Sequence, residues 1–247
     1  MEQRNATVAV IGAGDYIGAA IARRFAAEGY LVFAGRRQGD RLPELVAEIE
    51  AAGGRCSARA LDARKEEDIT AFLQEAEAAA PLEAVIFNVG ANVNFPILET
   101  TERVFRKVWE MGCYAGFLTG REAARLMLPR GAGSIFFTGA TASVRGGKGY
   151  AAFAAAKFGL RALAQSMARE LGPQGIHVAH LIVDSGVDTA FVRERIRAAG
   201  GDEAVAAIAP DQLMDPSSIA EVYWQLHRQP RDAWTHELDV RPYAEPF

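Results

Sequence analysis

The sequence predicts an α/β fold in which a doubly wound parallel β-sheet carries helices on both faces. Short β-branched or apolar runs alternate with longer helical patterns along the chain, which is typical of successive βαβ units. A length of 247 residues suits one α/β domain of the larger kind, and 50% hydrophobic residues suffice for a sizeable core. We therefore expect residues 1–247 to form a single domain.

The expected strands are short runs that are rich in apolar and β-branched residues. Each of the early runs is followed by a helical pattern before the next run begins, so the strands are expected to pair in parallel. They cover residues 7–11, 31–34, 56–61, 84–88, 134–138, 178–183 and 235–240.

The expected helices lie between these strands. In the first helix, over residues 17–28, Ile17, Ile21 and Phe25 recur every four residues and therefore share one face. A late helix begins at Asp215-Pro216, because Asp is a favoured N-cap and Pro fits the first helical position. The other helices are expected at residues 41–52, 66–80, 102–127 and 150–171.

Charge and composition exclude several classes of partner. A net charge of −4 leaves no basic excess for nucleic acid and no polybasic run for an anionic membrane surface. No apolar run approaches the length of a bilayer span, and a signal-peptide pattern is lacking. Cys56 and Cys113 make no disulfide framework or zinc pattern, and the histidines show no ligand spacing. We expect a cytoplasmic protein that takes a small-molecule substrate, without metal, nucleic acid or membrane.

A glycine-rich turn joins the first expected strand to the first expected helix. It reads Gly12-Ala-Gly14-Asp-Tyr16-Ile17-Gly18 and stands where a pyrophosphate meets helix N-terminal amides in dinucleotide-binding folds. Small residues let the backbone approach the phosphates closely. This strand–turn–helix context predicts a Rossmann-type fold with a cofactor at the turn. The alternative is a tight turn without a ligand.

The end of the second expected strand indicates which nicotinamide cofactor fits. NAD-specific sites usually carry an acidic residue there, which binds the ribose 2′-hydroxyl. This chain has Arg36 and Arg37, and Arg36 would pair with a 2′-phosphate as a charge-assisted fork. NADP(H) is therefore favoured over NAD(H). Against this, Asp15 on the glycine turn would repel the phosphate, and the arginines could be solvated charges alone.

Together with the glycine turn, several segments give the chain a resemblance to the short-chain dehydrogenase/reductase family over roughly residues 5–242. Asp62-Ala63, after the third strand, resembles the acidic segment that contacts adenine, and Asn88-Val-Gly90 resembles the family's turn after the fourth strand. Lys157 matches the lysine of the catalytic helix, and Val187 and Thr189 match the contacts to the nicotinamide carboxamide. The resemblance therefore implies cofactor contacts at Asp62, Ala63, Asn88, Gly90, Lys157, Val187 and Thr189.

The catalytic positions of the family are altered in this chain. The family uses an Asn, a Ser, a Tyr and a Lys, and the Tyr hydroxyl gives a proton to the substrate oxygen. Counted from Lys157, which matches the Lys, the other three positions hold Phe153, Ala140 and Cys113. A phenyl ring has no proton to give. Tyr150 lies one turn before Phe153 on the same helix face, so we predict Lys157 and Tyr150 as the catalytic residues. Alternative replacement groups, which the resemblance places near the pocket, are Thr138, Thr141, Ser143, Tyr114 and Cys113.

The segment 187–215 is expected to be a lid over the substrate, by analogy with the fold, or otherwise a surface helix pair. Just before it, Asp184 replaces a Pro that is frequent in the family. Its carboxylate would lie beside the nicotinamide, or it would form a polar turn in place of the Pro turn.

Three functions remain open, and all of them retain the cofactor. The favoured one is an NADP(H)-dependent oxidoreductase with an atypical active site, acting for example on an activated C=C or C=N bond. The second is a cofactor-binding protein without turnover, either a redox sensor or a partner subunit. The third is elimination or isomerisation on the same fold. The resemblance also implies a homodimer or homotetramer, formed through the helices at about 102–127 and 150–171.

Overall fold

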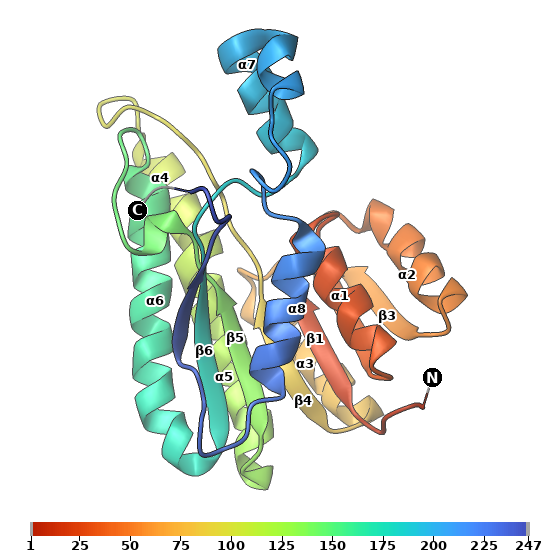
Figure 1. The fold of residues 1–247 in the computed structure, drawn as a ribbon. Helices are drawn as coiled ribbons and strands as arrows, with labels where there is room; N and C mark the ends of the chain where they lie inside the picture. Colours follow the sequence, from red (N-terminus) through yellow and green to blue (C-terminus); the bar gives the residue numbers. More distant parts are fainter. Residues whose placement is uncertain (1, 246–247) are drawn as a thin grey trace.

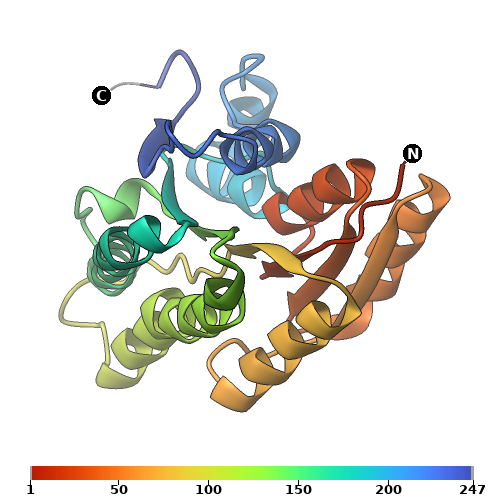
Figure 2. The ribbon, with the colours of Figure 1, turned by 90° about the horizontal axis from the view of Figure 1, so that it is seen from below.

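The structure is a computed structural model that describes residues 2–245, and within that range it is built round a seven-stranded sheet. The strand order is β3-β2-β1-β4-β5-β6-β7, and every neighbouring pair is parallel. With helices on both faces (Figures 1 and 2), the doubly wound α/β fold is confirmed. The strands are β1 (Thr7–Ile11), β2 (Leu31–Arg36), β3 (Arg55–Ala60), β4 (Leu82–Phe87), β5 (Gly133–Thr138), β6 (Ile176–Val183) and β7 (Glu237–Val240).

Two groups of helices bury the two faces of the sheet, each in its own apolar cluster. Phe25 and Tyr223 are fully buried under the first group, and Phe72 and Leu160 under the second. The first group comprises α1 (Ile17–Ala27), α2 (Leu42–Ala51) and α8 (Pro216–His227). The second group comprises α3 (Glu66–Ala79), α5 (Ala115–Met127) and α6 (Ala151–Leu171).

The order and type of the expected elements are confirmed, whereas several of their ends differ. The helix expected over residues 102–127 is divided into α4 (Glu102–Trp109), a π-helical turn (Glu110–Tyr114) and α5. β6 begins two residues earlier than expected, and β7 begins two residues later. At α8 the expected cap is confirmed, because Asp215 Oδ1 accepts a hydrogen bond from Ser217 N at 2.7 Å and Pro216 opens the helix.

The strand order reverses between β1 and β4, and this opens a crevice at the carboxyl ends of the strands. After β1 the chain passes to β2 and β3 on one side, and β4 to β7 lie on the other. α7 (Ala190–Ala206) projects beyond this edge of the sheet, at the top of Figure 1. It is interrupted by non-helical backbone at Gly200 and Gly201. Among the described residues, no helix is long and apolar enough to cross a membrane.

Candidate functional site

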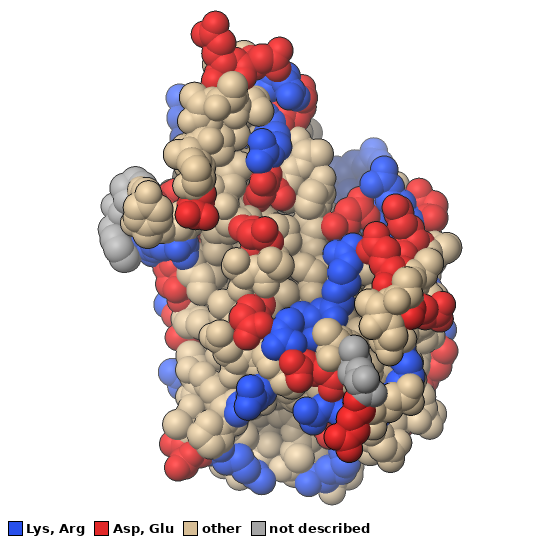
Figure 3. All heavy atoms as spheres, turned by 45° about the vertical axis from the view of Figure 1, so that its right-hand side comes forward, with Lys and Arg blue, Asp and Glu red and all other residues tan. Residues whose placement is uncertain are grey.

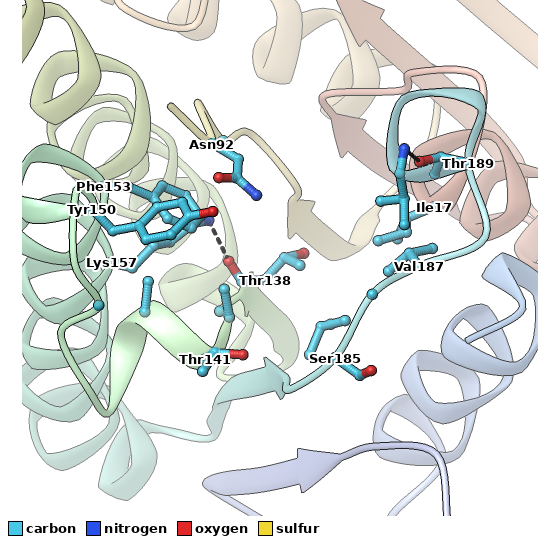
Figure 4. Close-up of a pocket in the computed structure, with 18 of the residues that line it drawn as sticks. Ile17, Asn92, Thr138, Thr141, Tyr150, Phe153, Lys157, Ser185, Val187 and Thr189 are labelled. Carbon is cyan, nitrogen blue, oxygen red and sulfur yellow. Dashed lines mark hydrogen bonds between the residues drawn. The ribbon is translucent and has the colours of Figure 1, made fainter. Parts of the chain in front are cut away.

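An open cavity of about 820 Å³ lies at the carboxyl ends of β4, β5 and β6, with α7 beside it (Figure 4). Its walls come from the glycine turn, the loops after these three strands, the start of α6 and one face of α7. Such a crevice at the reversal point of a doubly wound sheet is where these folds bind ligands. Predicted site residues in its lining are Ile17, Asn88, Gly90, Tyr150, Lys157, Val187 and Thr189.

The glycine turn packs so closely that two of its glycines have no room for a side chain. Gly12 has a φ of +94°, and a Cβ there would lie 2.7 Å from the Asn88 carbonyl oxygen. At Gly18 a Cβ would lie 2.2 Å from the Gly12 carbonyl oxygen. Asn88 Nδ2 also donates to Gly12 O at 3.1 Å, so the turn after β4 fixes the turn after β1. A Cβ at Gly14 would meet nothing within 4 Å, and the Gly14 amide donates to Gly12 O at 2.8 Å.

Tyr16 connects the glycine turn to the projecting helix. Its hydroxyl accepts a hydrogen bond from the Ala190 amide, the first residue of α7, at 2.8 Å. The neighbouring residue Ile17 lines the cavity, whereas Tyr16 does not. Thr189 caps α7, because its Oγ1 accepts from Val192 N at 3.1 Å. The turn and the segment 187–190 are therefore joined at the side of the cavity that Figure 4 shows around Ile17 and Thr189.

The arginine at the end of β2 is paired with a carboxylate. Arg36 donates to Asp15, and Arg41 Nη1 lies 2.9 Å from Asp15 Oδ2. Partial burial raises the pKa of the Asp15 carboxyl, but the hydrogen bonds and charges of Arg36 and Arg41 outweigh it and lower the pKa. These residues and Arg23 line a smaller hollow of about 200 Å³ beside the glycine turn. The hollow is also lined by Glu44 and Glu48, and Glu48 pairs with Arg23, so each of the three arginines already has a carboxylate partner.

Two further charged residues that we assigned to the nucleotide, Asp62 and Arg37, have contacts within the chain. Asp62 accepts from Arg64 Nη2 at 2.5 Å and from its Nε at 2.9 Å, and these contacts lower its pKa to about 2. The adjacent Ala63 is buried. Arg37 Nη1 lies 3.7 Å from Met111 Sδ. Neither Asp62 nor Arg37 lines the large cavity.

Lys157 is the buried cation of the cavity. Its Nζ donates to Thr138 O at 2.7 Å and to Val89 O at 3.1 Å, which ties α6 to the ends of β4 and β5. An ammonium has three N–H groups, so one is left for a ligand. The side chain is 4% exposed, and burial lowers its pKa to about 8. This ammonium is therefore positioned to donate a hydrogen bond into the cavity.

The residues that the sequence interpretation aligns with the catalytic positions of the family do not all line the cavity. Phe153 and Ala140 do, so a phenyl ring and a methyl group form part of its wall. Cys113 lies in the π-helical turn and packs against α6, because a Cβ at Gly159 would be 2.8 Å from its Sγ. Burial raises the pKa of the Cys113 thiol. It does not line the cavity.

Tyr150 brings a hydroxyl to the cavity from the residue that precedes α6. Figure 4 shows its ring beside Phe153 and Lys157, with the hydroxyl directed into the cavity. Its Oη accepts a hydrogen bond from Arg195 Nη2, on α7, at 2.6 Å. Because a guanidinium only donates, the phenolic proton of Tyr150 is free to be given to a ligand.

Three polar residues near the expected pocket have partners elsewhere. Thr138 Oγ1 lies 2.7 Å from the buried Tyr223 hydroxyl. Ser143 is buried, and its Oγ lies 3.3 Å from His180 Nε2. Asp184 is buried with its Oδ2 2.9 Å from Arg241 Nη2, and it does not line the cavity. The expectation that its carboxylate lies beside the nicotinamide is therefore not supported, because Arg241 binds it.

The sequence interpretation missed four polar residues that line the cavity, and Ser185, which follows β6, is one of them. Asn92 comes from the loop after β4, Arg145 from the loop before α6, and Arg195 from α7. A signal for Arg195 was present, because Val192, Arg195, Ile196 and Ala199 have the spacing of one helix face, and all four line the cavity. Asn92 and Arg145 lie in loops without periodicity. No group of His, Cys, Asp or Glu within the described range could hold a metal ion.

Comparisons with known proteins agree with this geometry. A family model described as short chain dehydrogenase matches residues 6–199. The 3-oxoacyl-[acyl-carrier-protein] reductase MabA of Mycobacterium avium is 31% identical over 195 residues, which cover 78% of this chain and 72% of that protein. A crystal structure of a short-chain dehydrogenase from Rhodopseudomonas palustris is 64% identical with a TM-score of 0.83, covering 97% of this chain and 100% of the other. A metagenomic short-chain oxidoreductase in complex with NADP is 25% identical with a TM-score of 0.82, covering 98% of each chain.

Proposed function

The chain belongs to the short-chain dehydrogenase family, and from this membership we propose that it is an NADP(H)-dependent oxidoreductase with an atypical active site. One observation carries the proposal: a single cavity is lined by the glycine-turn helix at Ile17, by Thr189 and by the buried Lys157. Residues 1–247 would form one dinucleotide-binding domain, with 187–215 as the segment over the substrate.

The residues around the glycine turn fit a dinucleotide. The turn has no space for side chains at Gly12 and Gly18, and a pyrophosphate needs that close backbone approach. The hollow lined by Arg23, Arg36 and Arg41 supports NADP(H) over NAD(H), because guanidinium groups suit a 2′-phosphate. A relative that is 25% identical has been solved with NADP. Asp15 and Glu48 oppose this preference, since their carboxylates already pair with all three arginines.

When bound, the nicotinamide would supply or accept a hydride. Lys157 would donate its remaining N–H to the nucleotide or the substrate, and its buried position keeps water from competing. Tyr150 would give its phenolic proton to the substrate atom that becomes negative during reduction, since Arg195 leaves that proton free. Phe153 and Ala140 would supply apolar walls in place of the usual hydroxyl groups.

A second candidate function is cofactor binding without turnover, as a redox sensor or a partner subunit. It is favoured by the phenyl ring of Phe153 and the methyl group of Ala140 in the cavity wall. A positioned general acid contributes about 10²–10⁴-fold to a rate, and an oxyanion donor about 10²–10³-fold. A chain that has lost both without replacement would bind the cofactor and turn over almost nothing.

We also propose that the protein is a cytoplasmic homodimer or homotetramer. Trp109, Phe117 and Phe158 lie on α4, α5 and α6 and are 40%, 38% and 41% exposed. Trp109 and Phe117 both stack on Tyr114, with ring centroids 6.0 and 6.3 Å apart. Exposed aromatic groups on neighbouring helices suit a protein interface, and free cysteines suit a reducing compartment. Light scattering that shows a monomer would contradict the oligomer.

The proposed function is tested by titrating the protein with NADPH and NADH while nicotinamide fluorescence is followed. A panel of carbonyl, enone and imine compounds is then offered with the bound reduced cofactor. Tighter binding of NADPH and its oxidation by a panel member support the reductase. Binding without oxidation of either cofactor favours the second candidate. If neither nucleotide binds, both proposals are wrong.

A further inference from the structure

The large cavity has an uneven distribution of charge. The cations in its lining are Arg145, Lys157 and Arg195, and none of the described lining residues is Asp or Glu. The other lining residues are small or apolar, or they carry neutral polar groups. A cavity of this composition attracts anions and repels cations, because no carboxylate in its lining offsets the three positive charges.

α7 has one apolar face with a single cation and one face of paired ions. The face towards the cavity holds Val192, Arg195, Ile196 and Ala199. On the rest of the helix, Arg193 Nε lies 2.6 Å from Asp188 Oδ1 and Arg197 Nε lies 2.7 Å from Asp202 Oδ1. Figure 3 shows acidic and basic side chains together on this projection.

Arg195 has no carboxylate partner among the described residues, unlike Arg193 and Arg197 on the same helix. Its guanidinium donates to the neutral Tyr150 hydroxyl and lies over the Phe191 ring, 5.8 Å from the centroid. It forms no ion pair with any residue between positions 2 and 245, and neither does Arg145. Two guanidinium groups in one cavity wall therefore have no carboxylate partner within the described chain.

These cations lie away from the expected position of the cofactor phosphates. Figure 4 shows Tyr150 on one side of the cavity and Ile17 with Thr189 on the other. Arg195 contacts Tyr150. Arg145 lies in the loop that leads to Tyr150 and lines the same cavity. A nucleotide on the glycine turn would have its phosphates on the Ile17 side, so these two cations are available to a different ligand.

We propose that the cavity binds a substrate with an apolar body and a carboxylate, and that Arg195, assisted by Arg145, binds the carboxylate at the Tyr150 side. A planar guanidinium matches a carboxylate with two parallel hydrogen bonds. Phe153, Ile196 and Ala140 offer the apolar contacts for the body of the substrate. The inference deepens the proposed function, and it depends on that function for the position of NADP(H).

The test is an NMR titration of the full chain, saturated with NADP⁺, with hexanoate and with hexanamide. These probes have the same chain length and differ in charge. We expect hexanoate to bind about tenfold to a hundredfold more tightly, because a hydrogen bond to a charged group is worth about 1.5–3 kcal/mol. Arg195→Gln should reduce hexanoate binding to the hexanamide level, and Arg145→Gln should weaken it less.

Two variants serve as controls. Arg193→Gln removes a cation from the same helix that is already paired with Asp188, and it should leave hexanoate binding unchanged. Arg195→Lys keeps the charge without the planar fork and should bind hexanoate with intermediate affinity. Equal binding of the two probes, absence of hexanoate binding, or equal losses in Arg193→Gln and Arg195→Gln would each overturn the proposal.

A separate measurement of NADP⁺ binding distinguishes failure of the proposed function from failure of the carboxylate site. NADP⁺ binding is measured by itself for each variant, and Arg195→Gln should retain it. If the unsubstituted chain binds no NADP⁺, the proposed function fails. Hexanoate and hexanamide are then compared on the free chain, and the same difference between Arg195→Gln and Arg193→Gln decides the inference.

Discussion

The Tyr150 hydroxyl accepts a hydrogen bond from Arg195 Nη2 at 2.6 Å, although 45 residues separate them along the chain. The contact joins the residue before α6 to α7, and both residues line the cavity. It places a phenol with a free proton beside a guanidinium that has no carboxylate partner among the described residues. Proton donation and carboxylate binding would therefore be neighbouring events in this cavity.

Replacement of Tyr150 by Phe tests its role as proton donor. We expect kcat for the best substrate of the panel to fall by about 10²–10⁴-fold, as for loss of a positioned general acid. The affinity for NADPH should not change, because Tyr150 lies on the side of the cavity away from Ile17. Tyr114→Phe is the control, since Tyr114 stacks on Trp109 outside the cavity lining. An unchanged kcat in Tyr150→Phe would assign the proton to another group.

The double substitution Ala140→Ser, Phe153→Tyr should increase ordinary carbonyl reduction. Both side chains already line the cavity, and Phe153 lies one turn before Lys157 on α6. The two hydroxyl groups would restore a proton donor and an oxyanion donor, which we expect to raise kcat/KM for simple ketones at least about tenfold. NADPH oxidation measured with each single variant separates the two contributions. If the double variant gains nothing, the cavity does not hold a ketone against this wall.

The fold could be predicted from the sequence because its signals are local. The alternation of apolar runs and helical patterns predicts the strands and the helices other than α7, which lies in the weakly patterned segment 187–215. The Asp215-Pro216 start of α8 is a local cap. The π-helical turn at Glu110–Tyr114 could not be predicted in this way, since its residues fit a regular helix pattern. It depends on packing against α6, where Gly112 and Gly159 let the helices approach closely.

The geometry of the glycine turn was predictable from the sequence, whereas the contacts at the Tyr150 side of the cavity were much less so. The glycine turn needs residues without side chains, and that requirement is visible in the sequence. Arg195 meets Tyr150 only after α7 has folded over the cavity, so no local pattern joins them. For Asp184 the neighbours in sequence leave two positions open, beside the nicotinamide or in a polar turn, and the ion pair with Arg241 depends on a residue from the far end of the chain.

Because Lys157 is buried, the free energy of unfolding should vary with pH in the alkaline range. Burial lowers its pKa from 10.5 to about 8 in the folded protein. Between these values the unfolded chain binds more protons than the folded one, so stability rises with pH in that window and is flat below it. The slope would be at most about 1.4 kcal/mol per pH unit for one group.

Comparison with Lys157→Met isolates this contribution. Denaturant unfolding at several pH values should show the free energy of unfolding of the unsubstituted chain rising relative to the variant from about pH 8 upward. Below about pH 8 the difference should be constant, because Lys157 is then protonated in both the folded and the unfolded chain. Parallel curves across the whole range would mean that Lys157 has an ordinary pKa in the folded protein.

Asp15 and Arg36 should control the choice between NADPH and NADH in opposite directions. Arg36 and Arg41 pair with Asp15, so a 2′-phosphate would have to compete with this carboxylate for the same guanidinium groups. Asp15→Asn removes the carboxylate that competes with the 2′-phosphate for the guanidinium groups and that repels it. We therefore expect NADPH to bind about tenfold more tightly, with little change for NADH. Arg36→Gln should weaken NADPH by about tenfold to a hundredfold and leave NADH almost unchanged.

The measurement for this pair is the ratio of the two dissociation constants, obtained from nicotinamide fluorescence for each variant. Arg59→Gln is the matched control, because Arg59 also has an acidic partner, Glu75 at 3.1 Å, but does not line the hollow beside the glycine turn. Its ratio should equal that of the unsubstituted chain. If Arg36→Gln and Asp15→Asn shift both cofactors equally, the 2′-phosphate does not bind in the hollow lined by Arg23, Arg36 and Arg41. The preference for NADP(H) would then have no basis at the end of β2, where the sequence indicated it.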